Sequence, residues 1–196
     1  IQYIKNYIYD YPTGEVQTLF SGVYPIFQYT QANAFFRGAD LDATVRLLNK
    51  NRVAQVGNPT SLDYHLKASV VWANEVKTGR YFPFIPAPRL SQSLEYNKTH
   101  RNSLLSRMSA SIGHTFVAKQ TRFEPSQELV PTTPDAYHLF EASIGGTLDI
   151  GKRQTLDIRL SAENLFNTEY KEYTNRFRYY AHDLGRNVYL RVNYNF

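Results

Sequence analysis

The chain ends in GRNVYLRVNYNF, residues 185–196, and this stretch decides how the rest of the sequence is interpreted. After the glycine, apolar or aromatic side chains alternate with polar ones. One side carries Val188, Leu190, Val192, Tyr194 and Phe196, and the other carries Tyr189, Arg191, Asn193 and Asn195. Because successive side chains of a β-strand point to opposite faces of a sheet, the pattern predicts a strand with two different faces.

The same alternation recurs along most of the chain, and no helical period competes with it. Thr155 to Ala162 and Phe140 to Leu148 are clear examples. The sequence therefore predicts an all-β fold with eight strands, at residues 1–10, 25–48, 62–75, 88–98, 103–121, 136–150, 154–168 and 186–196.

The predicted connections differ in length in a regular way. Residues 99–102 and 151–154 are short and polar, as hairpin turns are. Residues 11–24, 76–87, 122–135 and 170–185 are long, and residues 49–61 are also long, an exception to the alternation. Short and long connections in alternation are typical of an antiparallel up-and-down meander with one elaborated end. We find no linker or low-complexity segment, so residues 1–196 are interpreted as one domain.

Composition excludes several functions. The chain has 16 Tyr and 12 Phe but no cysteine, which removes disulfides and thiol nucleophiles. Its formal charge is +5, yet the basic residues are scattered and no nucleic-acid-binding motif is present. No nucleic-acid partner is therefore expected. The longest uncharged stretch, Val16 to Phe36, contains Pro, Gly and amides and is not a membrane helix.

Alternation alone fits either a soluble sandwich or a membrane barrel, because the two differ only in which face meets water. Three features favour the membrane barrel. Several predicted strands reach the ~9–11 residues that cross a bilayer. Tyr and Phe gather near strand ends, as in interfacial girdles. Full charges such as Asp157, Arg159 and Arg191 stand in mid-strand, where a dry core would need them paired.

The C-terminal third resembles the end of TonB-dependent outer-membrane receptors. In that family the penultimate strand carries an NLFN-x-x-Y run and the last strand follows Gly-Arg. Here LSAENLFNTEY spans residues 160–170, and the motif positions are Asn164, Leu165, Phe166, Asn167, Tyr170, Gly185 and Arg186. Upstream, residues 24–45 resemble the family's A-x-x-x-G-x-E run, with Asp40 where Glu is commoner, and residues 82–96 resemble a loop-to-strand passage.

The resemblance implies a 22-stranded transmembrane β-barrel with an N-terminal plug. Residues 1–196 would then be the C-terminal portion of that barrel, about eight strands, with the plug and earlier strands absent. The location implied is the outer membrane of a Gram-negative bacterium. The function implied is import of a scarce nutrient such as a siderophore–iron, haem or metal complex, with no permanently bound cofactor and no enzymatic step.

The partners implied are the rest of the same receptor, outer-membrane lipid and lipopolysaccharide, and the barrel-insertion machinery. The TonB–ExbB–ExbD complex would act through the absent plug. We also expect Phe196, with Tyr194, to be the terminal signal for assembly, so that deleting Phe196 lowers the amount of receptor in the membrane without changing its affinity. Two alternatives stay open: a self-contained eight-stranded outer-membrane barrel, whose first and last strands would pair, and a soluble β-sandwich binding module.

Ligand-binding candidates lie in the predicted long loops. Arginine binds anionic chelates through two parallel hydrogen bonds, tyrosine stacks and donates a hydroxyl, and histidine or tyrosine ligates iron. The candidates on this basis are Arg80, Tyr81, Arg122, Arg178, Tyr180 and His182. No catalytic constellation is found, because Ser103, Ser106 and Ser109 lack the strand-turn-helix context of a nucleophile elbow. No two histidines have the spacing of a local metal motif.

Overall fold

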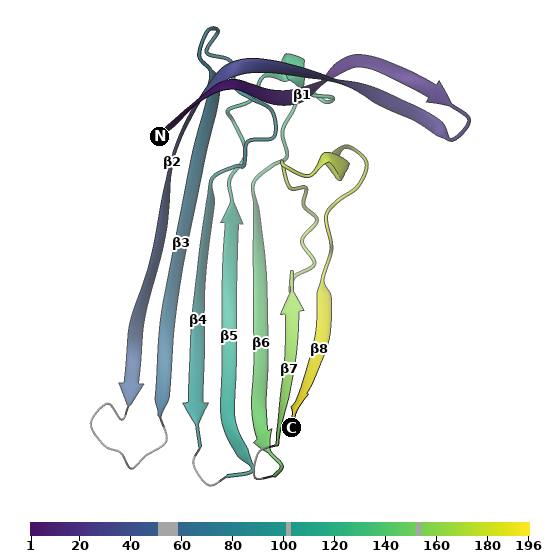
Figure 1. The fold of residues 1–196 in the computed structure, drawn as a ribbon. Helices are drawn as coiled ribbons and strands as arrows, with labels where there is room; N and C mark the ends of the chain where they lie inside the picture. Colours follow the sequence, from purple (N-terminus) through teal and green to yellow (C-terminus); the bar gives the residue numbers. More distant parts are fainter. Residues whose placement is uncertain (51–58, 101–102, 152–153) are drawn as a thin grey trace.

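The computed structural model describes residues 1–50, 59–100, 103–151 and 154–196. One antiparallel sheet contains eight strands in chain order (Figure 1). The all-β, up-and-down prediction is confirmed. The strands are β1 (Gln2–Leu19), β2 (Gly22–Lys50), β3 (Thr60–Glu75), β4 (Arg89–Thr99), β5 (Leu105–Val117), β6 (Tyr137–Asp149), β7 (Thr155–Glu163) and β8 (Asn187–Asn195), with short 3-10 turns η1 (Pro125–Gln127) and η2 (Arg176–Tyr179).

The long connections lie at one end of the sheet, which we call the loop end (Figure 1). They join β3 to β4, β5 to β6 and β7 to β8. At the opposite end, the predicted connections 49–61, 99–102 and 151–154 lie partly outside the described residues. No helix in the described part of the chain is long and apolar enough to cross a membrane.

The predicted loop at residues 11–24 is wrong. β1 continues to Leu19 and β2 begins at Gly22, so the two strands form a long hairpin that extends over the loop end (Figure 1). Pro12 and Gly14 are accommodated at a register shift between Pro12 and Val16. Because β1 pairs only with β2, the missing N–H of Pro12 is tolerated at a strand edge.

Two other strands end earlier than predicted. β5 ends at Val117 because the chain then turns away, with Ala118 N donating to Pro88 O at 2.9 Å. β7 ends at Glu163 because Asn164 adopts a left-handed conformation with φ of 46°. The alternation itself stops at Phe116 and Ala162, so the predicted bounds extended both strands beyond the pattern that supported them.

The sheet is open. Its neighbour order runs from β1 to β8, and within the described ranges β1 and β8 do not pair. β1 begins its pairing with β2 at Phe36, so the segment of β2 after Phe36 is bonded on one side only, to β3. A closed barrel requires further strands or a rearranged hairpin at this edge.

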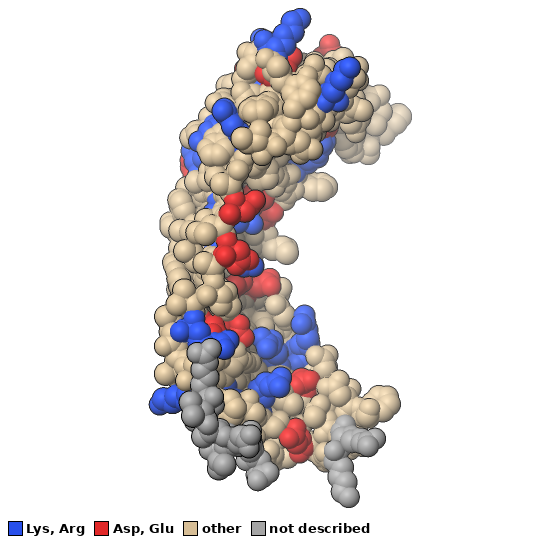
Figure 2. All heavy atoms as spheres, turned by 60° about the vertical axis from the view of Figure 1, so that its left-hand side comes forward, with Lys and Arg blue, Asp and Glu red and all other residues tan. Residues whose placement is uncertain are grey.

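The two faces of the sheet have opposite chemistry. The outer face carries exposed apolar side chains on β2 and on β4 to β8, among them Leu41, Leu90, Leu94, Ile112, Ile144, Leu160, Leu190 and Val192. The inner face is hollowed, and charged residues gather in the hollow (Figure 2). The buried apolar residues lie instead at the loop end, in clusters around Phe82 and around Val117 and Tyr137.

Candidate functional site

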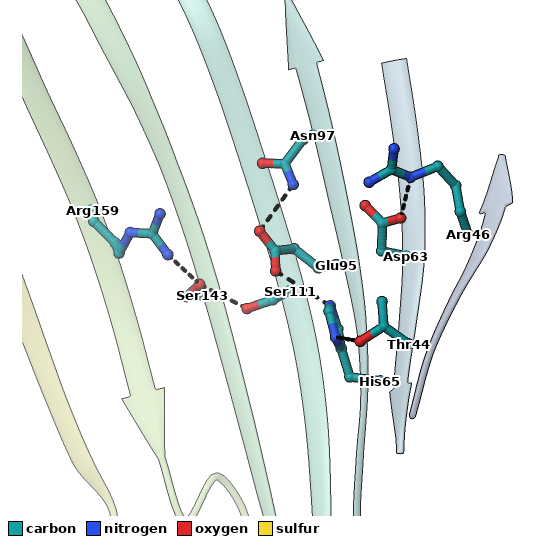
Figure 3. A network of polar contacts seen from close by, with 9 residues as sticks. All are labelled: Thr44, Arg46, Asp63, His65, Glu95, Asn97, Ser111, Ser143 and Arg159. Carbon is teal, nitrogen blue, oxygen red and sulfur yellow. Dashed lines mark hydrogen bonds and ion pairs between the residues drawn. The ribbon is translucent and has the colours of Figure 1, made fainter. Parts of the chain in front are cut away.

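The polar inner face is held together by hydrogen bonds between neighbouring strands (Figure 3). Arg46 Nε on β2 donates to Asp63 Oδ1 on β3 at 2.6 Å. His65 Nε2 lies 3.7 Å from Glu95 Oε2 on β4, and Glu95 accepts a second bond from Asn97 at 2.9 Å. Arg46 and Asp63 are therefore paired in charge, and Glu95 is held by His65 and Asn97.

The other half of the inner face carries arginines and carboxylates that form no ion pairs within the described ranges. Arg159 on β7 donates only to the hydroxyls of Ser143 at 3.4 Å and Ser109 at 3.3 Å. Arg191 on β8 stands directly opposite Arg159 in the strand register. Neither arginine has a carboxylate within 4.0 Å among the described residues. Opposed like charges are destabilising in a dry interface, so this face is suited to water.

At the loop end, Arg178 is the centre of a buried polar cluster. Its guanidinium donates to Glu128, to the carbonyl of Tyr173 and, at 2.7 Å, to the hydroxyl of Tyr179. Tyr173 and Tyr179 also donate their hydroxyls to Glu128. Burial, together with the hydrogen bond to Glu128, raises the pKa of both tyrosines above the usual range. The cluster ties the β5–β6 loop to the β7–β8 loop.

A second anchor joins the β7–β8 loop to the overhanging hairpin. Arg176 Nη2 donates to Asp10 Oδ1 of β1 at 2.6 Å, and its other Nη bonds the second carboxylate oxygen. The guanidinium also lies over the ring of Phe84 at 4.9 Å. The hydrogen bond to Asp10 raises the pKa of Arg176, which keeps the guanidinium charged.

A cavity of about 370 Å³ lies between the upper ends of β6 to β8 and the β7–β8 loop. Glu172 sits in its wall and accepts from Arg89 and, at 2.7 Å, from the hydroxyl of Tyr137. Tyr170 and Asp183 also line it, and burial followed by the charge of Asp183 raises the pKa of Tyr170. No group of three or more potential metal-ligating side chains occurs in the part of the chain that the structure describes.

The NLFN run forms the turn that ends β7 and prepares β8. Asn164 accepts from Thr168 N at 2.8 Å and donates to Thr168 O at 2.9 Å. Asn167 Oδ1 accepts from Arg186 N at 2.9 Å, just before β8 begins. A Cβ at Gly185 would lie 2.7 Å from the same Oδ1, so any larger residue would displace the Asn167 side chain from its bond to Arg186 N. The motif therefore has a structural reason in this chain.

The remaining motif residues contact the outer and inner faces of β6. Leu165 N donates to Phe140 O at 2.8 Å, and Phe166 meets the ring of Phe140 edge-on at 5.1 Å between centroids. Tyr170 packs on Tyr137 at 4.6 Å. These contacts hold the start of the β7–β8 loop against the sheet.

Three of the predicted ligand-binding residues make contacts within the protein. Arg178 is 3% exposed and saturated with partners, a position that favours a structural role. Arg122 lies over the ring of Trp72, with its guanidinium carbon 4.5 Å from the ring centroid. Tyr81 forms a short bridge with Asn74 beside the end of β3.

The other three lie at the surface. Arg80 is exposed in the β3–β4 loop, and Tyr180 and His182 are exposed in the β7–β8 loop. The six candidates thus occupy three loops, and none of their described contacts joins one loop's candidates to another's. Ligand binding by these six residues stays a prediction.

Sequence reasoning missed Asp10 and Glu128, the acidic partners that position the loops. Asp10 lies 166 residues from Arg176 in the chain, and no local pattern connects them. Tyr194 and Phe196 stack at the end of β8, with ring centroids 5.9 Å apart, and both are exposed. This arrangement leaves their role in assembly untested.

Comparison with known proteins identifies the fold. No protein-family model matches the chain, and no curated protein matches it in sequence. Among solved structures, the chain is similar to copper transporter OprC, with a TM-score of 0.62 and 19% sequence identity. The alignment covers 97% of this chain and 27% of OprC, so the chain spans about a quarter of that protein's length. At this identity the similarity shows the fold alone.

Proposed function

We propose that this chain forms part of the wall of an outer-membrane transport barrel of the TonB-dependent receptor type. The observation that carries the proposal is the division of one sheet into an exposed apolar outer face and a charged, hollowed inner face. In a membrane barrel the apolar face meets lipid and the polar face lines the lumen. A soluble sheet would have to cover the apolar face with a second layer, which the described residues do not supply.

The strand lengths support the same function. β4 to β8 contain between 9 and 13 residues, matching the ~9–11 residues that a tilted strand needs to cross a bilayer. Short connections at one end and long ones at the other match the periplasmic turns and extracellular loops of such barrels. The loop end is then the extracellular side.

Two further observations support a larger receptor. The sheet is open at both edges, and open edges are not tolerated in lipid. The fold match covers nearly all of this chain but about a quarter of copper transporter OprC. The missing strands, the plug and the contacts with the TonB complex would come from the rest of the same protein. The proposed cargo is a metal ion or a metal complex, including siderophore–iron or haem, and its passage needs no covalent chemistry.

The test uses single-cysteine variants, since residues 1–196 contain no cysteine and any cysteine elsewhere in the full-length protein is first replaced by serine. In the full-length protein in its native membrane, the cysteine of Val192→Cys should resist a water-soluble maleimide. When this cysteine is labelled with a fluorophore in denaturant and the protein is returned to lipid, nitroxide-bearing lipids should quench the fluorescence. Asn193→Cys, its neighbour on the opposite face, should react readily in water. Equal labelling of both, or recovery of the protein in the soluble fraction, would contradict a membrane barrel.

Uptake measurements address the transport step. Cells that lack the full-length protein should lose energy-dependent uptake of one cargo among copper, iron–siderophore complexes and haem. Native mass measurement of the protein in mild detergent distinguishes a larger receptor from a self-contained eight-stranded barrel. The self-contained barrel would have the 22.7 kDa mass of this chain, and the larger receptor a greater mass.

A further inference from the structure

A shallow apolar hollow lies on the outer face near the loop end, crossing β2 to β5. Its volume is about 430 Å³. Alanines at positions 68 and 118 leave space between larger neighbours, and the apolar side chains around it are Leu41, Ala68, Val70, Leu90, Phe116 and Ala118. A hollow of this kind accepts a hydrocarbon chain without the loss of any hydrogen bond.

Two arginines border this hollow on its loop-end side. Trp72 stands opposite Arg37 in the register of β2 and β3, and the next pair along the same face is Ala39 with Val70, in the wall of the hollow. One same-face step along a strand is about 7 Å. Arg122 reaches the same place from the β5–β6 loop and covers the ring of Trp72. Arg37, Trp72 and Arg122 therefore form a basic rim directly above the hollow.

The charge of this rim is not neutralised within the protein. Neither Arg37 nor Arg122 forms an ion pair in the described ranges. Arg46, Arg89, Arg176 and Arg178 each have a carboxylate partner. The other unpaired arginines of the strands, such as Arg159 and Arg191, lie on the hydrated inner face. The rim thus places two unpaired arginines on the apolar outer face, directly beside the hollow.

We propose that the hollow and its rim bind a phosphorylated lipid of the outer leaflet, which in an outer membrane is lipopolysaccharide. Its phosphate lies between the guanidinium groups of Arg37 and Arg122, and one acyl chain occupies the hollow. Arginine is suited to this role because its planar fork binds phosphate through parallel charge-assisted hydrogen bonds. Trp72 occupies the headgroup depth that indole rings prefer. The inference rests on the proposed membrane location, with the loop end outside.

The proposed lipid site gives Arg122 a different role from the ligand binding that the sequence predicted. Its position in a long loop predicted contact with an imported ligand, but the structure directs it to the outer face. Contact with the lipid would hold the β5–β6 loop down against β3, and the same loop carries Glu128 of the buried cluster. Lipid binding would therefore stabilise the loop end as well as anchor the barrel.

The experiment measures lipid retained by the full-length protein purified in mild detergent, by native mass spectrometry. The probes are lipid A, lipid A without its phosphates, and phosphatidylglycerol. The wild type should retain phosphorylated lipid A about tenfold better than the dephosphorylated form. The double variant Arg37→Gln/Arg122→Gln should lose this preference, and Ala68→Phe, which fills the hollow, should lower retention of lipid A with all charges intact.

The matched control is Lys77→Gln/Arg80→Gln, which removes the same charge from the exposed β3–β4 loop and should leave retention unchanged. Equal retention by the rim variant and this control would overturn the site, and so would a preference for phosphatidylglycerol. Failure of the lipid site leaves the Val192→Cys and Asn193→Cys labelling intact. Failure of the membrane location itself would abolish that difference in labelling.

Discussion

On β4, the neighbours Ser93 and Leu94 lie on opposite faces of the sheet and are at least partly exposed, whereas at the loop end Phe82 and Arg178 are buried within the chain. The strands from β3 to β8 have few buried side chains away from the loop end. The loop end contains both buried apolar clusters and the buried Arg178–Glu128 pair. The strands are therefore ordered by backbone hydrogen bonds to their neighbours and by their surroundings, and the loop end by side-chain packing within the protein.

Arg178→Ala should have the largest effect, because it destabilises the loop end and leaves the strands unchanged. It would leave the carboxylate of Glu128 buried without its cation, which costs about 3–5 kcal/mol. Hydrogen exchange of the full-length protein should show lost protection in the β5–β6 and β7–β8 loops, with β4 and β5 unchanged. Replacing both partners, as Arg178→Met/Glu128→Leu, should restore much of the protection. An unchanged loop end in Arg178→Ala would show that the pair does not hold it.

Leu94→Lys should destabilise the sheet while leaving the packing of the loop end intact. In the proposed membrane barrel Leu94 faces lipid, where a lysine costs up to about 2–4 kcal/mol. Urea unfolding in lipid vesicles measures this cost, and Ser93→Lys is the matched control because it places the same charge in the hydrated hollow. Equal destabilisation by both substitutions would contradict the assignment of the two faces.

High pH should weaken the loop end and spare the sheet. Tyr173 and Tyr179 have raised pKa values, so they stay protonated in the folded state where unfolded tyrosines, with pKa values of about 10, lose their protons. The unfolded state then binds fewer protons, and the free energy of unfolding falls as pH rises above about 10. Proteolysis of the loops at about pH 8 and pH 11, with tyrosinate absorbance, measures this smaller effect. Simultaneous loosening of loops and strands would contradict it.

The same contrast explains what the sequence could predict. Alternation from Leu94 to Val192 depends on local backbone geometry, so the strands and their faces could be inferred without tertiary contacts. Pro12 and Gly14 resembled loop residues because their tolerance depends on the unpaired edge of β1, which sequence does not reveal. The loop end depends on contacts between distant segments. For this reason Arg178 resembled a ligand-binding residue although its partner is Glu128.

The bond between Asp10 and Arg176 also bears on the order of folding. These residues belong to the first strand and the last loop, 166 residues apart, so closing them costs more chain entropy than pairing any two neighbouring strands. Hairpins between neighbours form first, and the contact of the hairpin with η2 forms when the intervening strands are already in register. A crosslink between cysteines placed at these two positions would therefore report, during folding, the moment at which the eight strands of this sheet are assembled.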